Sequence, residues 1–442
     1  MSDVTMGISM AGDLDPDFSQ TDFEPGRVEI WKAFDWSLMD VFFASIAPAS
    51  NGQMYVSGYF SDFDTGQDFY CLGRLEAGGA RDIRFGNDGV VTGTFSEGSK
   101  ISLPSKVVIQ GDGKVVMLEL DASSRVEADP ELIVVRFLDT GELDTEFGLN
   151  GIRRYDLTAE GYRGLVFNVG ALQVLADGFI YGSVTGTRDP GNIESVVIFR
   201  LTMQGDWDLS FGNQGILDIS VQGKSMRGTD FVIQPDGGIV LAGYTTSPQD
   251  GSATGRLYRF DSRGRPDNSF GPGDAGFLEV IVLGKKVEIS TIAMRLDGSL
   301  ALAGVISSDF SDLDSSGFIM GITADGVPDP SFSNGEVVET PINDDYWVQW
   351  MSAIFQADGR LLVMGRSQPK SESIGDSYMY VTRYRLDGIL DSSFGVEGRV
   401  ETFVGGYNEP PTEIQLQADG KIVVGLNGTS FNRGLLLRYL ND

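Results

Sequence analysis

Two short motifs recur along the chain with the same period, and this repetition limits the fold more than any other feature. A glycine followed three residues later by Asp-x-x-Phe occurs seven times, ending at Phe18, Phe85, Phe147, Phe211, Phe270, Phe332 and Phe394. A turn of the form Asp-Gly or Asn-Gly, placed before an apolar run, also occurs seven times, at Gly52, Gly113, Gly178, Gly237, Gly298, Gly359 and Gly420. Because both motifs share one period, the chain is built from seven similar units.

Each repeat is predicted to contain four short antiparallel strands. In the last repeat, residues 399–403 and 412–417 alternate apolar and polar side chains, and 421–425 and 435–439 are short apolar runs. Asp419-Gly420 is a hairpin signal, since both residues accept a positive φ. Seven repeats of four strands, without helical periodicity, predict an all-β fold: a seven-bladed β-propeller of four-stranded antiparallel blades. A pair of separate β-sandwiches is the alternative, and it leaves the unbroken repeat unexplained.

The most regular copies of the motifs resemble a known repeat family. Gly388-Ile-Leu-Asp-Ser-Ser-Phe-Gly395, paired with Gln417-Ala-Asp-Gly-Lys-Ile-Val-Val424, is similar to the bacterial Delta-60 repeat. The resemblance extends from about Gly12 to Asp442, with Ser19 and Ser333 in place of the glycine that follows the phenylalanine. It implies a β-propeller scaffold without assigned catalytic residues, in bacterial proteins for which export is common. No signal peptide is visible in this sequence.

The Asp-x-x-Phe motif also predicts how the ring is divided and closed. A single domain is expected, with blades at about 20–78, 79–140, 141–204, 205–263, 264–325, 326–387, and 388–442 together with 12–19. The residues eight positions before the motif aspartates are Arg74, Arg136, Arg200, Arg259, Gly321 and Arg383. We expect each arginine to pair with its aspartate and fix the turn between blades. The seventh pair would join Arg438 to Asp15, so the chain termini should meet and close the ring.

Charge and composition exclude several classes of function. The chain has 33 basic and 63 acidic residues, and its net charge of −30 argues against binding to nucleic acid or to anionic membranes. It has no histidine, which excludes catalytic systems and metal sites that need one. The single cysteine, Cys71, excludes an intrachain disulfide and a cysteine zinc site. No apolar stretch is long enough to span a membrane, so we expect a soluble protein. We also expect a monomer.

One face of the predicted ring is suited to binding a partner. The Asp-x-x-Phe links and the Asp-Gly turns should share one face, and the connections of variable length should share the other. These variable connections are acidic and aromatic in the first, sixth and seventh repeats, which are neighbours in a closed ring. The candidate binding residues are Asp35, Trp36, Asp344, Asp345, Tyr346, Trp347, Trp350 and Tyr407. Such side chains suit a sugar ring or a protein hot spot, and the alternative is that the rings only pack the loops.

Two oxygen-rich loops are weaker candidates for calcium. Their ligands would be Asp62, Asp64 and Asp68 in one loop, and Asp312, Asp314 and Ser316 in the other. The second loop matches the first half of a calcium-binding loop, but Thr323 stands where the bidentate glutamate is needed. A solvated acidic hairpin is the alternative, and no cofactor other than calcium is expected.

Two functions are compatible with these features. We favour a non-catalytic binding or interaction scaffold whose partner is a protein or a glycan on its variable face. The alternative is a carboxylate-dependent glycoside hydrolase or lyase, because such enzymes need no histidine, and Asp35, Asp344 and Asp345 would be its carboxylates. Among 63 acidic residues some pair is expected at a suitable separation by chance, so this signal is weak.

Overall fold

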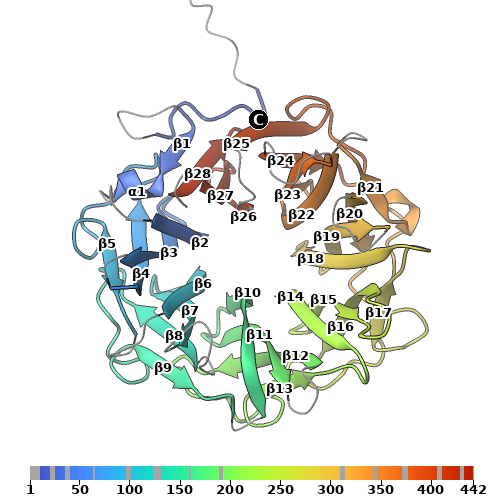
Figure 1. The fold of residues 1–442 in the computed structure, drawn as a ribbon, viewed down its shortest axis with the longest axis horizontal. Coiled ribbons are helices and arrows are strands. Elements are labelled where there is room, and N and C mark those ends of the chain that lie inside the picture. Colours follow the sequence, from blue (N-terminus) through green and yellow to red (C-terminus); the bar gives the residue numbers. More distant parts are fainter. Residues whose placement is uncertain are drawn as a thin grey trace, which may run out of the picture.

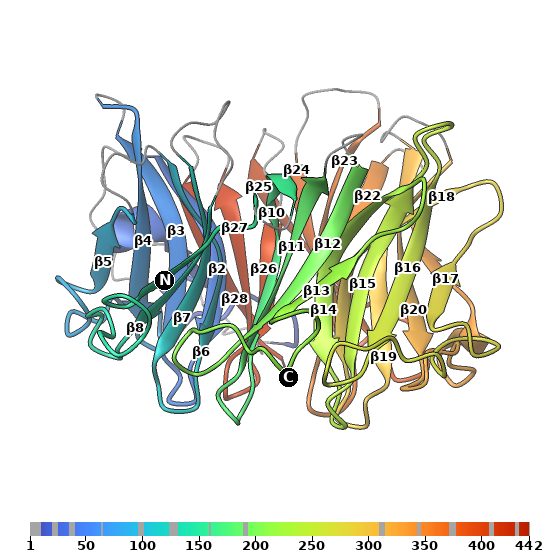
Figure 2. The ribbon, with the colours of Figure 1, turned by 90° about the horizontal axis from the view of Figure 1, so that it is seen from below.

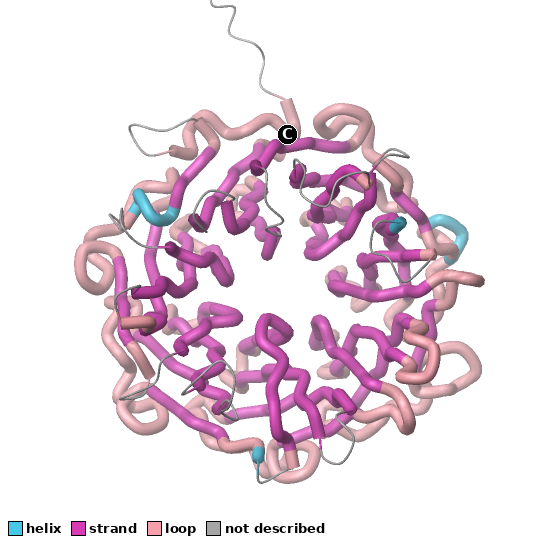
Figure 3. The backbone as a smooth tube through the Cα atoms, in the orientation of Figure 1, coloured by secondary structure: helices cyan, strands magenta, loops and turns pink. Residues whose placement is uncertain are grey.

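The structure is a computed structural model of the whole chain. It describes residues 10–19, 25–34, 40–62, 65–95, 101–122, 131–158, 161–188, 193–308, 314–342, 346–370, 377–405, 411–428 and 433–441. Strands dominate the described residues, and helix is limited to single turns such as α1 (Ile30–Ala33) and η3 (Ser333–Gly335) (Figure 3). None of the helices in these ranges has the length and apolar character needed to cross a membrane.

The chain forms the predicted seven-bladed β-propeller, with seven four-stranded antiparallel blades arranged around one axis (Figure 1). A single parallel bridge between the first strand of the first blade and the third strand of the seventh, at Val41 and Arg433, joins these two blades into one sheet. The first three blades are β2 (Asp40–Pro48), β3 (Met54–Asp62), β4 (Gln67–Leu75) and β5 (Val90–Gly93); β6 (Ile101–Ile109), β7 (Val115–Ala122), β8 (Glu131–Phe137) and β9 (Ile152–Tyr155); and β10 (Tyr162–Val174), β11 (Ile180–Arg188), β12 (Ile193–Leu201) and β13 (Ile216–Ile219). In each blade the first strand is the innermost.

The remaining four blades repeat this order. They are β14 (Ser225–Ile233), β15 (Ile239–Thr246), β16 (Ala253–Phe260) and β17 (Phe277–Val280); β18 (Lys286–Met294), β19 (Leu300–Ser307), β20 (Ser315–Ile322) and β21 (Val338–Thr340); β22 (Tyr346–Phe355), β23 (Leu361–Pro369), β24 (Ser377–Tyr384) and β25 (Arg399–Gly405); and β26 (Pro411–Leu416), β27 (Ile422–Gly428), β28 (Arg433–Tyr439) and β1 (Arg27–Glu29). Middle strands are continuous apolar runs because both faces of a blade pack on its neighbours.

The two ends of the chain meet and close the ring, as predicted, although the N-terminal strand that takes part, residues 27–29, was expected in the first blade. β1 pairs antiparallel with β28, so the seventh blade combines three C-terminal strands with one N-terminal strand. The link before β1 adds further bonds, from the backbone N–H of Asp15 to the carbonyl of Arg438 (2.9 Å) and from the N–H of Gly12 to the carbonyl of Leu440 (2.8 Å). The Arg438 Nε lies 2.8 Å from Oδ2 of Asp15, which confirms the seventh arginine–aspartate pair.

The strands are divided among the sheets differently from the predicted blade boundaries. The motif placed residues 399–403 in the same blade as 412–417, but β25 pairs with β24 and therefore belongs to the preceding sheet. The same offset of one strand applies around the ring. Its cause is that the compact Asp-x-x-Phe link reverses the chain within a blade, whereas the next connection crosses to a new blade.

The recurring arginine and phenylalanine hold neighbouring blades together. Every motif phenylalanine is at most 1% exposed, namely Phe18, Phe85, Phe147, Phe211, Phe270, Phe332 and Phe394. Arg74, Arg136, Arg200, Arg259, Arg383 and Arg438 all pair with the expected aspartates. Five of these arginines also donate to a backbone carbonyl in the next blade, on Asp139, Met203, Ser262, Asn441 and Ala77. Each of these five thus links one blade to the next, besides fixing its own turn.

Blade 5 lacks this arginine and replaces it from another position. A Cβ added to Gly321 would lie 2.5 Å from Cβ of Phe332, so no side chain fits there. Arg295, which follows β18, instead directs its guanidinium over the ring of Phe355 at 4.7 Å. Its Nη2 lies 3.5 Å from the carbonyl oxygen of Leu386, which is the carbonyl in blade 6 that an arginine at 321 would have reached.

The two faces of the ring carry different connections. Neighbouring strands are antiparallel, so the Asp-Gly turns and the Asp-x-x-Phe links emerge together on one face (Figure 2). The connections between the second and third strands of each blade, and those from one blade to the next, emerge on the opposite face. We call the first the constant face and the second the variable face.

Candidate functional site

Most of the predicted binding residues lie outside the described part of the chain. These are Asp35, Trp36, Asp344, Asp345 and Tyr407. The three that are described, Tyr346, Trp347 and Trp350, belong to the first half of β22, whereas the sequence suggested a loop or the strand end beside it.

Two of these three aromatic residues are buried. The Trp350 side chain is fully buried, and its ring fills the space above Gly317 and Gly365, where an added Cβ would lie 2.2 Å and 2.6 Å from ring atoms. Trp347 is 6% exposed, and the guanidinium carbon of Arg366 lies 5.1 Å from the centroid of its ring. The prediction that Trp350 belongs to a ligand-binding surface therefore conflicts with its position in the core between blades 5 and 6.

Tyr346 and two aromatic side chains that were not among the candidates reach the variable end of blade 6. Tyr346 and Tyr378 are partly exposed and Phe403 is 53% exposed. The ring centroids of Tyr346 and Tyr378 are 6.2 Å apart, and those of Tyr378 and Phe403 are 5.6 Å apart. We call these three residues the aromatic row. They come from β22, β24 and β25, and Tyr378 is the direct cross-strand partner of Phe403.

Polar groups lie beside the aromatic row. The Tyr380 hydroxyl is paired with the carboxylate of Glu401, on the same sheet face as Tyr378 and Phe403 and two residues further along each strand. Burial, followed by this bond and the charge of Glu401, raises the pKa of the Tyr380 phenol above its ordinary value. Lys370 Nζ lies 3.3 Å from Oδ1 of Asp314, joining blade 6 to blade 5. The end of the blade thus combines apolar rings with carboxylate, hydroxyl and ammonium groups.

The aromatic row belongs to blade 6 alone among the first six blades. The positions that correspond to Tyr378, five residues before the motif arginine or glycine, hold Phe69, Glu131, Ser195, Thr254 and Ser316. The positions that correspond to Phe403 follow the last paired residue of each outer strand. They hold Thr94, Asp156, Ser220, Ile281 and Pro341. A residue required for packing every blade would recur, so the pair Tyr378 and Phe403 is not explained by the repeat.

Sequence analysis did not identify Tyr378 and Phe403, although part of the signal was present. Tyr378 and Tyr380 are two residues apart, as are Glu401 and Phe403. Residues two apart in a strand point to the same face of the sheet, so each pair shares a face. This spacing does not reveal that the two strands are neighbours, which depends on the register of the sheet.

The predicted calcium loops show no metal geometry in their described residues. Asp64 and Asp312 lie outside the described ranges. Asp68 is buried and accepts a hydrogen bond of 2.6 Å from Ser61, and Asp62 accepts one of 2.7 Å from Thr65. Hydrogen bonds from Ser308 and Lys370 and the charge of Lys370 lower the pKa of Asp314. Ser316 belongs to β20, opposite Ile306. Within the described ranges, no group of three or more acidic or cysteine side chains could hold a metal ion.

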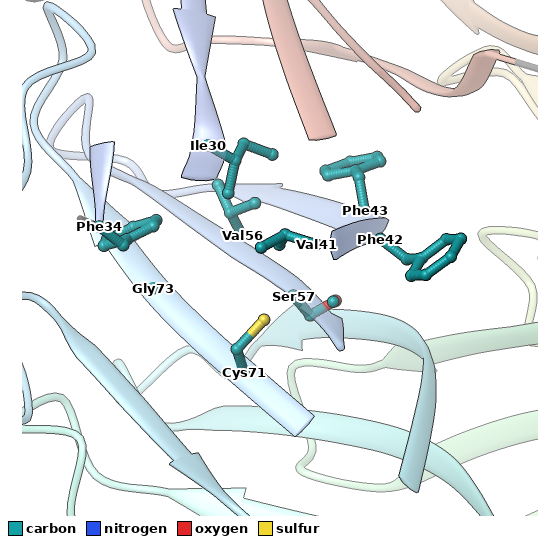
Figure 4. Close-up of a pocket in the computed structure, with 10 residues that line it drawn as sticks. Ile30, Phe34, Val41, Phe42, Phe43, Val56, Ser57, Cys71 and Gly73 are labelled. Carbon is teal, nitrogen blue, oxygen red and sulfur yellow. The ribbon is translucent and has the colours of Figure 1, made fainter. Parts of the chain in front are cut away.

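A small cavity lies in blade 1 beside α1 (Figure 4). Its lining includes Ile30, Phe34, Ser57 and Cys71, and its volume is about 10 Å³, which is room for about one water molecule. Burial, and then the charge of Glu119, raises the pKa of the Cys71 thiol, so the thiol is unreactive. The cavity is too small for an organic ligand.

Comparison with known families places the chain among propeller proteins. A family model described as "Domain of unknown function (DUF5122) beta-propeller" matches residues 234–270, which span β15, β16 and the Asp-x-x-Phe motif of blade 4. The chain is a β-propeller repeat protein. Curated proteins give no significant match.

Solved structures are similar in fold only. The β-propeller domain of the Trilobed protease from Pyrococcus furiosus is 10% identical, with a TM-score of 0.45, over 91% of this chain and 94% of that chain. A protein of unknown function from Dyadobacter fermentans is 12% identical, with a TM-score of 0.43, over 86% and 98%. The α-L-arabinanase of Penicillium chrysogenum is 10% identical, with a TM-score of 0.43, over 91% and 93%.

Proposed function

We propose that the protein is a non-catalytic binding scaffold of the Delta-60 repeat type, and that it binds a carbohydrate on its variable face at blade 6. The observation that supports this proposal is the aromatic row of Tyr346, Tyr378 and Phe403. Exposed rings of this kind are unusual on a surface that otherwise carries a net charge of −30.

The chemistry of the row suits a sugar better than a flat protein surface. Sugar rings present apolar C–H faces edged by hydroxyl groups. The half-exposed ring of Phe403 offers an apolar face, and Glu401 and the tyrosine hydroxyls nearby offer hydrogen-bond partners for hydroxyl groups. The carboxylates of the hydrolase hypothesis, Asp35, Asp344 and Asp345, lie outside the described residues, so no observation favours catalysis.

A glycan-array screen of the whole protein tests this proposal, followed by calorimetry and a reducing-sugar assay on each hit. We expect binding without release of reducing sugar. Phe403→Ala should weaken binding about five- to thirtyfold, the loss typical of an aromatic anchor. Phe277→Ala is the matched control, because Phe277 is a partly exposed ring on the outer strand of blade 4 and away from the row. Equal losses in the two variants would contradict the proposal. A screen without hits would favour a protein partner instead.

A further inference from the structure

Five outer strands carry an acidic residue at the same position, and the one in blade 6 differs from the others in its partner. The position lies opposite the residue three before the motif arginine or glycine, and it holds Asp218, Glu279, Glu339, Glu401 and Glu29 in blades 3 to 7. In four of these blades the carboxylate pairs with a cation, namely Arg188, Arg256, Lys285 and Lys32. The charge at this position is therefore usually compensated within the fold.

Glu401 has a hydroxyl group where the other four carboxylates have a cation. The phenol of Tyr380, directly opposite on β24, donates to Oε2 of Glu401. Among the residues that the structure describes, no lysine or arginine nitrogen lies within 4 Å of this carboxylate. Arg399 is two residues earlier on β25, but its charge acts on the buried Tyr384 phenol, nearer the constant face, where it partly offsets the rise in pKa that burial causes. The charge of Glu401 is thus not compensated by a direct ion pair.

The Glu401 carboxylate is open to a ligand. Its side chain is exposed, and the Tyr380 hydroxyl uses one of the about four lone-pair positions that a carboxylate offers. Burial, and then the hydrogen bond to Glu401 and its charge, raise the pKa of the Tyr380 phenol, so this neighbour stays neutral. Phe403, 53% exposed, follows two residues later on the same sheet face, at a Cα separation of about 7 Å. An uncompensated negative charge therefore lies beside an exposed apolar ring on the open surface.

The rings of the aromatic row are inclined to one another, which suits a single sugar chain better than a flat surface. The ring planes of Tyr346 and Tyr378 differ by 71°, and those of Tyr378 and Phe403 differ by 60°. Rings in these orientations cannot all lie against one flat polysaccharide face. A single oligosaccharide can turn between successive sugars and place each of them on a different ring, so the ligand is expected to be a soluble chain.

We propose that the aromatic row and Glu401 together select oligosaccharides whose sugars carry free amino groups, an inference that rests on the carbohydrate function proposed above. A sugar that stacks its C–H face on Phe403 brings its protonated amino group to the free oxygen of Glu401, where it donates a charge-assisted hydrogen bond. The faces of the aromatic rings attract the same ammonium group. Glu401 repels the carboxylate of an acidic sugar, so uronic acids are disfavoured.

Calorimetric titration of the whole protein with a glucosamine trimer tests the proposal, at a pH where its amino groups are protonated. The N-acetylated trimer and the glucose trimer of the same linkage are matched probes without the positive charge. We expect the glucosamine trimer to bind about five- to tenfold more tightly than either, since an exposed charge-assisted bond discriminates by about that factor. Equal affinities for the three trimers would overturn the preference for amino sugars and leave the carbohydrate function in place. Failure of every glycan to bind would overturn both.

Two variants with the same change of charge separate recognition at this site from general attraction to an acidic protein. Glu401→Gln should lower the affinity for the glucosamine trimer to that of the neutral trimers and leave their binding unchanged. Glu279→Gln is the matched control, because Glu279 occupies the same position in blade 4 and pairs with Arg256. It should leave all three affinities unchanged. An equal loss in the two variants would refute the role of Glu401.

A lysine trimer tests whether the sugar rings matter, since it carries the same number of side-chain ammonium groups without them. We expect it to bind more weakly than the glucosamine trimer, and Phe403→Ala to weaken only the binding of the sugars. A lysine trimer that binds as tightly as the glucosamine trimer would show that the surface takes any polycation, which overturns the proposal. These comparisons among ligands need only the wild-type protein, so they remain decisive if a variant fails to fold.

Discussion

Removing Arg438 should destabilise the whole ring and loosen its closure. Arg438 is 3% exposed and Asp15 is 1% exposed, with Nε and Oδ2 2.8 Å apart. The guanidinium also donates to Oε1 of Gln417 at 2.9 Å, and its carbon lies 4.4 Å from the centroid of the Phe18 ring. Breaking a buried ion pair costs about 3–5 kcal/mol. Lys421 Nζ remains 2.9 Å from Oδ2 of Asp15, so we expect the lower end, about 3 kcal/mol, for Arg438→Ala.

The corresponding change in melting temperature is small but measurable. A chain of 442 residues has an unfolding entropy of about 0.9 kcal/mol per kelvin near its melting temperature. A loss of 3 kcal/mol therefore lowers Tm by about 3 °C if the ring unfolds as one unit. Differential scanning calorimetry measures this shift directly.

Arg136→Ala is the matched control for the closure. Arg136 is also 3% exposed, its Nε lies 2.8 Å from Oδ2 of Asp144, and Lys114 Nζ lies 3.1 Å from the same oxygen. We expect a similar loss of Tm. Only Arg438→Ala should also speed hydrogen exchange in residues 12–18, β1 and β28, because only there does the pair join the two ends of the chain. An unchanged Tm in Arg438→Ala, or equally fast exchange of these segments in Arg136→Ala, would refute the reasoning.

Two further predictions concern the core and the pH dependence. Trp350→Ala should lower Tm by roughly 3–5 °C, since deleting a buried tryptophan costs about 3–5 kcal/mol. Phe403→Ala should lower Tm by under roughly 1 °C, because this side chain is half exposed. Similar shifts of the two variants in calorimetry would contradict the assignment of Trp350 to the core. Burial acts to raise the pKa of the Asp82 carboxyl. Hydrogen bonds from Arg84, together with the charge of Arg74 and its hydrogen bond, outweigh this effect and lower the pKa to about 2. Its ionised form thus stabilises the fold fully above the ordinary value near 4, and this contribution is lost as pH falls toward 2. The Tm deficit of Asp82→Asn should therefore be constant from pH 7 to 5 and shrink below pH 4, and a deficit that persists at pH 2 would show that it does not arise from ionisation.

The number of blades, the turns, the arginine–aspartate pairs and the closure of the ring could be predicted from sequence. Each depends on residues with narrow physical requirements. The glycine before Asp-x-x-Phe is an example. Gly79, Gly141 and Gly205 have φ values of 89°, 91° and 80°, and other residues adopt such values only with strain. A motif fixed by backbone conformation recurs with little variation, so its period shows the number of blades. The eight-residue spacing of Arg and Asp is fixed in the same way by one tight link.

The division into sheets and the aromatic row could not be predicted because both depend on which strands pair. β25 has the same alternating pattern whether it pairs with β24 or with β26, and only the geometry of the links decides between the two. For the same reason the sequence alone does not show that Trp350 is a core residue. Its strand begins at Tyr346, and the glycines that receive its ring, Gly317 and Gly365, come from strands that the sequence does not connect to it.

Blade 5 shows what the repeat conserves. Gly321 stands where other blades have an arginine, and Arg295 makes the contact with the Leu386 carbonyl instead. The position of Arg295 is glutamine in several other blades, namely Gln110, Gln234, Gln356 and Gln417. What recurs around the constant face is therefore a contact between blades, and a change of residue is accompanied by a substitute for that contact. Tyr378 and Phe403 behave in the opposite way, because seven of the ten corresponding residues in the first five blades are polar and only Phe69, Ile281 and Pro341 are apolar. A position that varies freely among blades is not constrained by the ring, so an aromatic pair that occurs at these positions in blade 6, and in none of the first five blades, is better explained by a ligand than by the stability of the propeller.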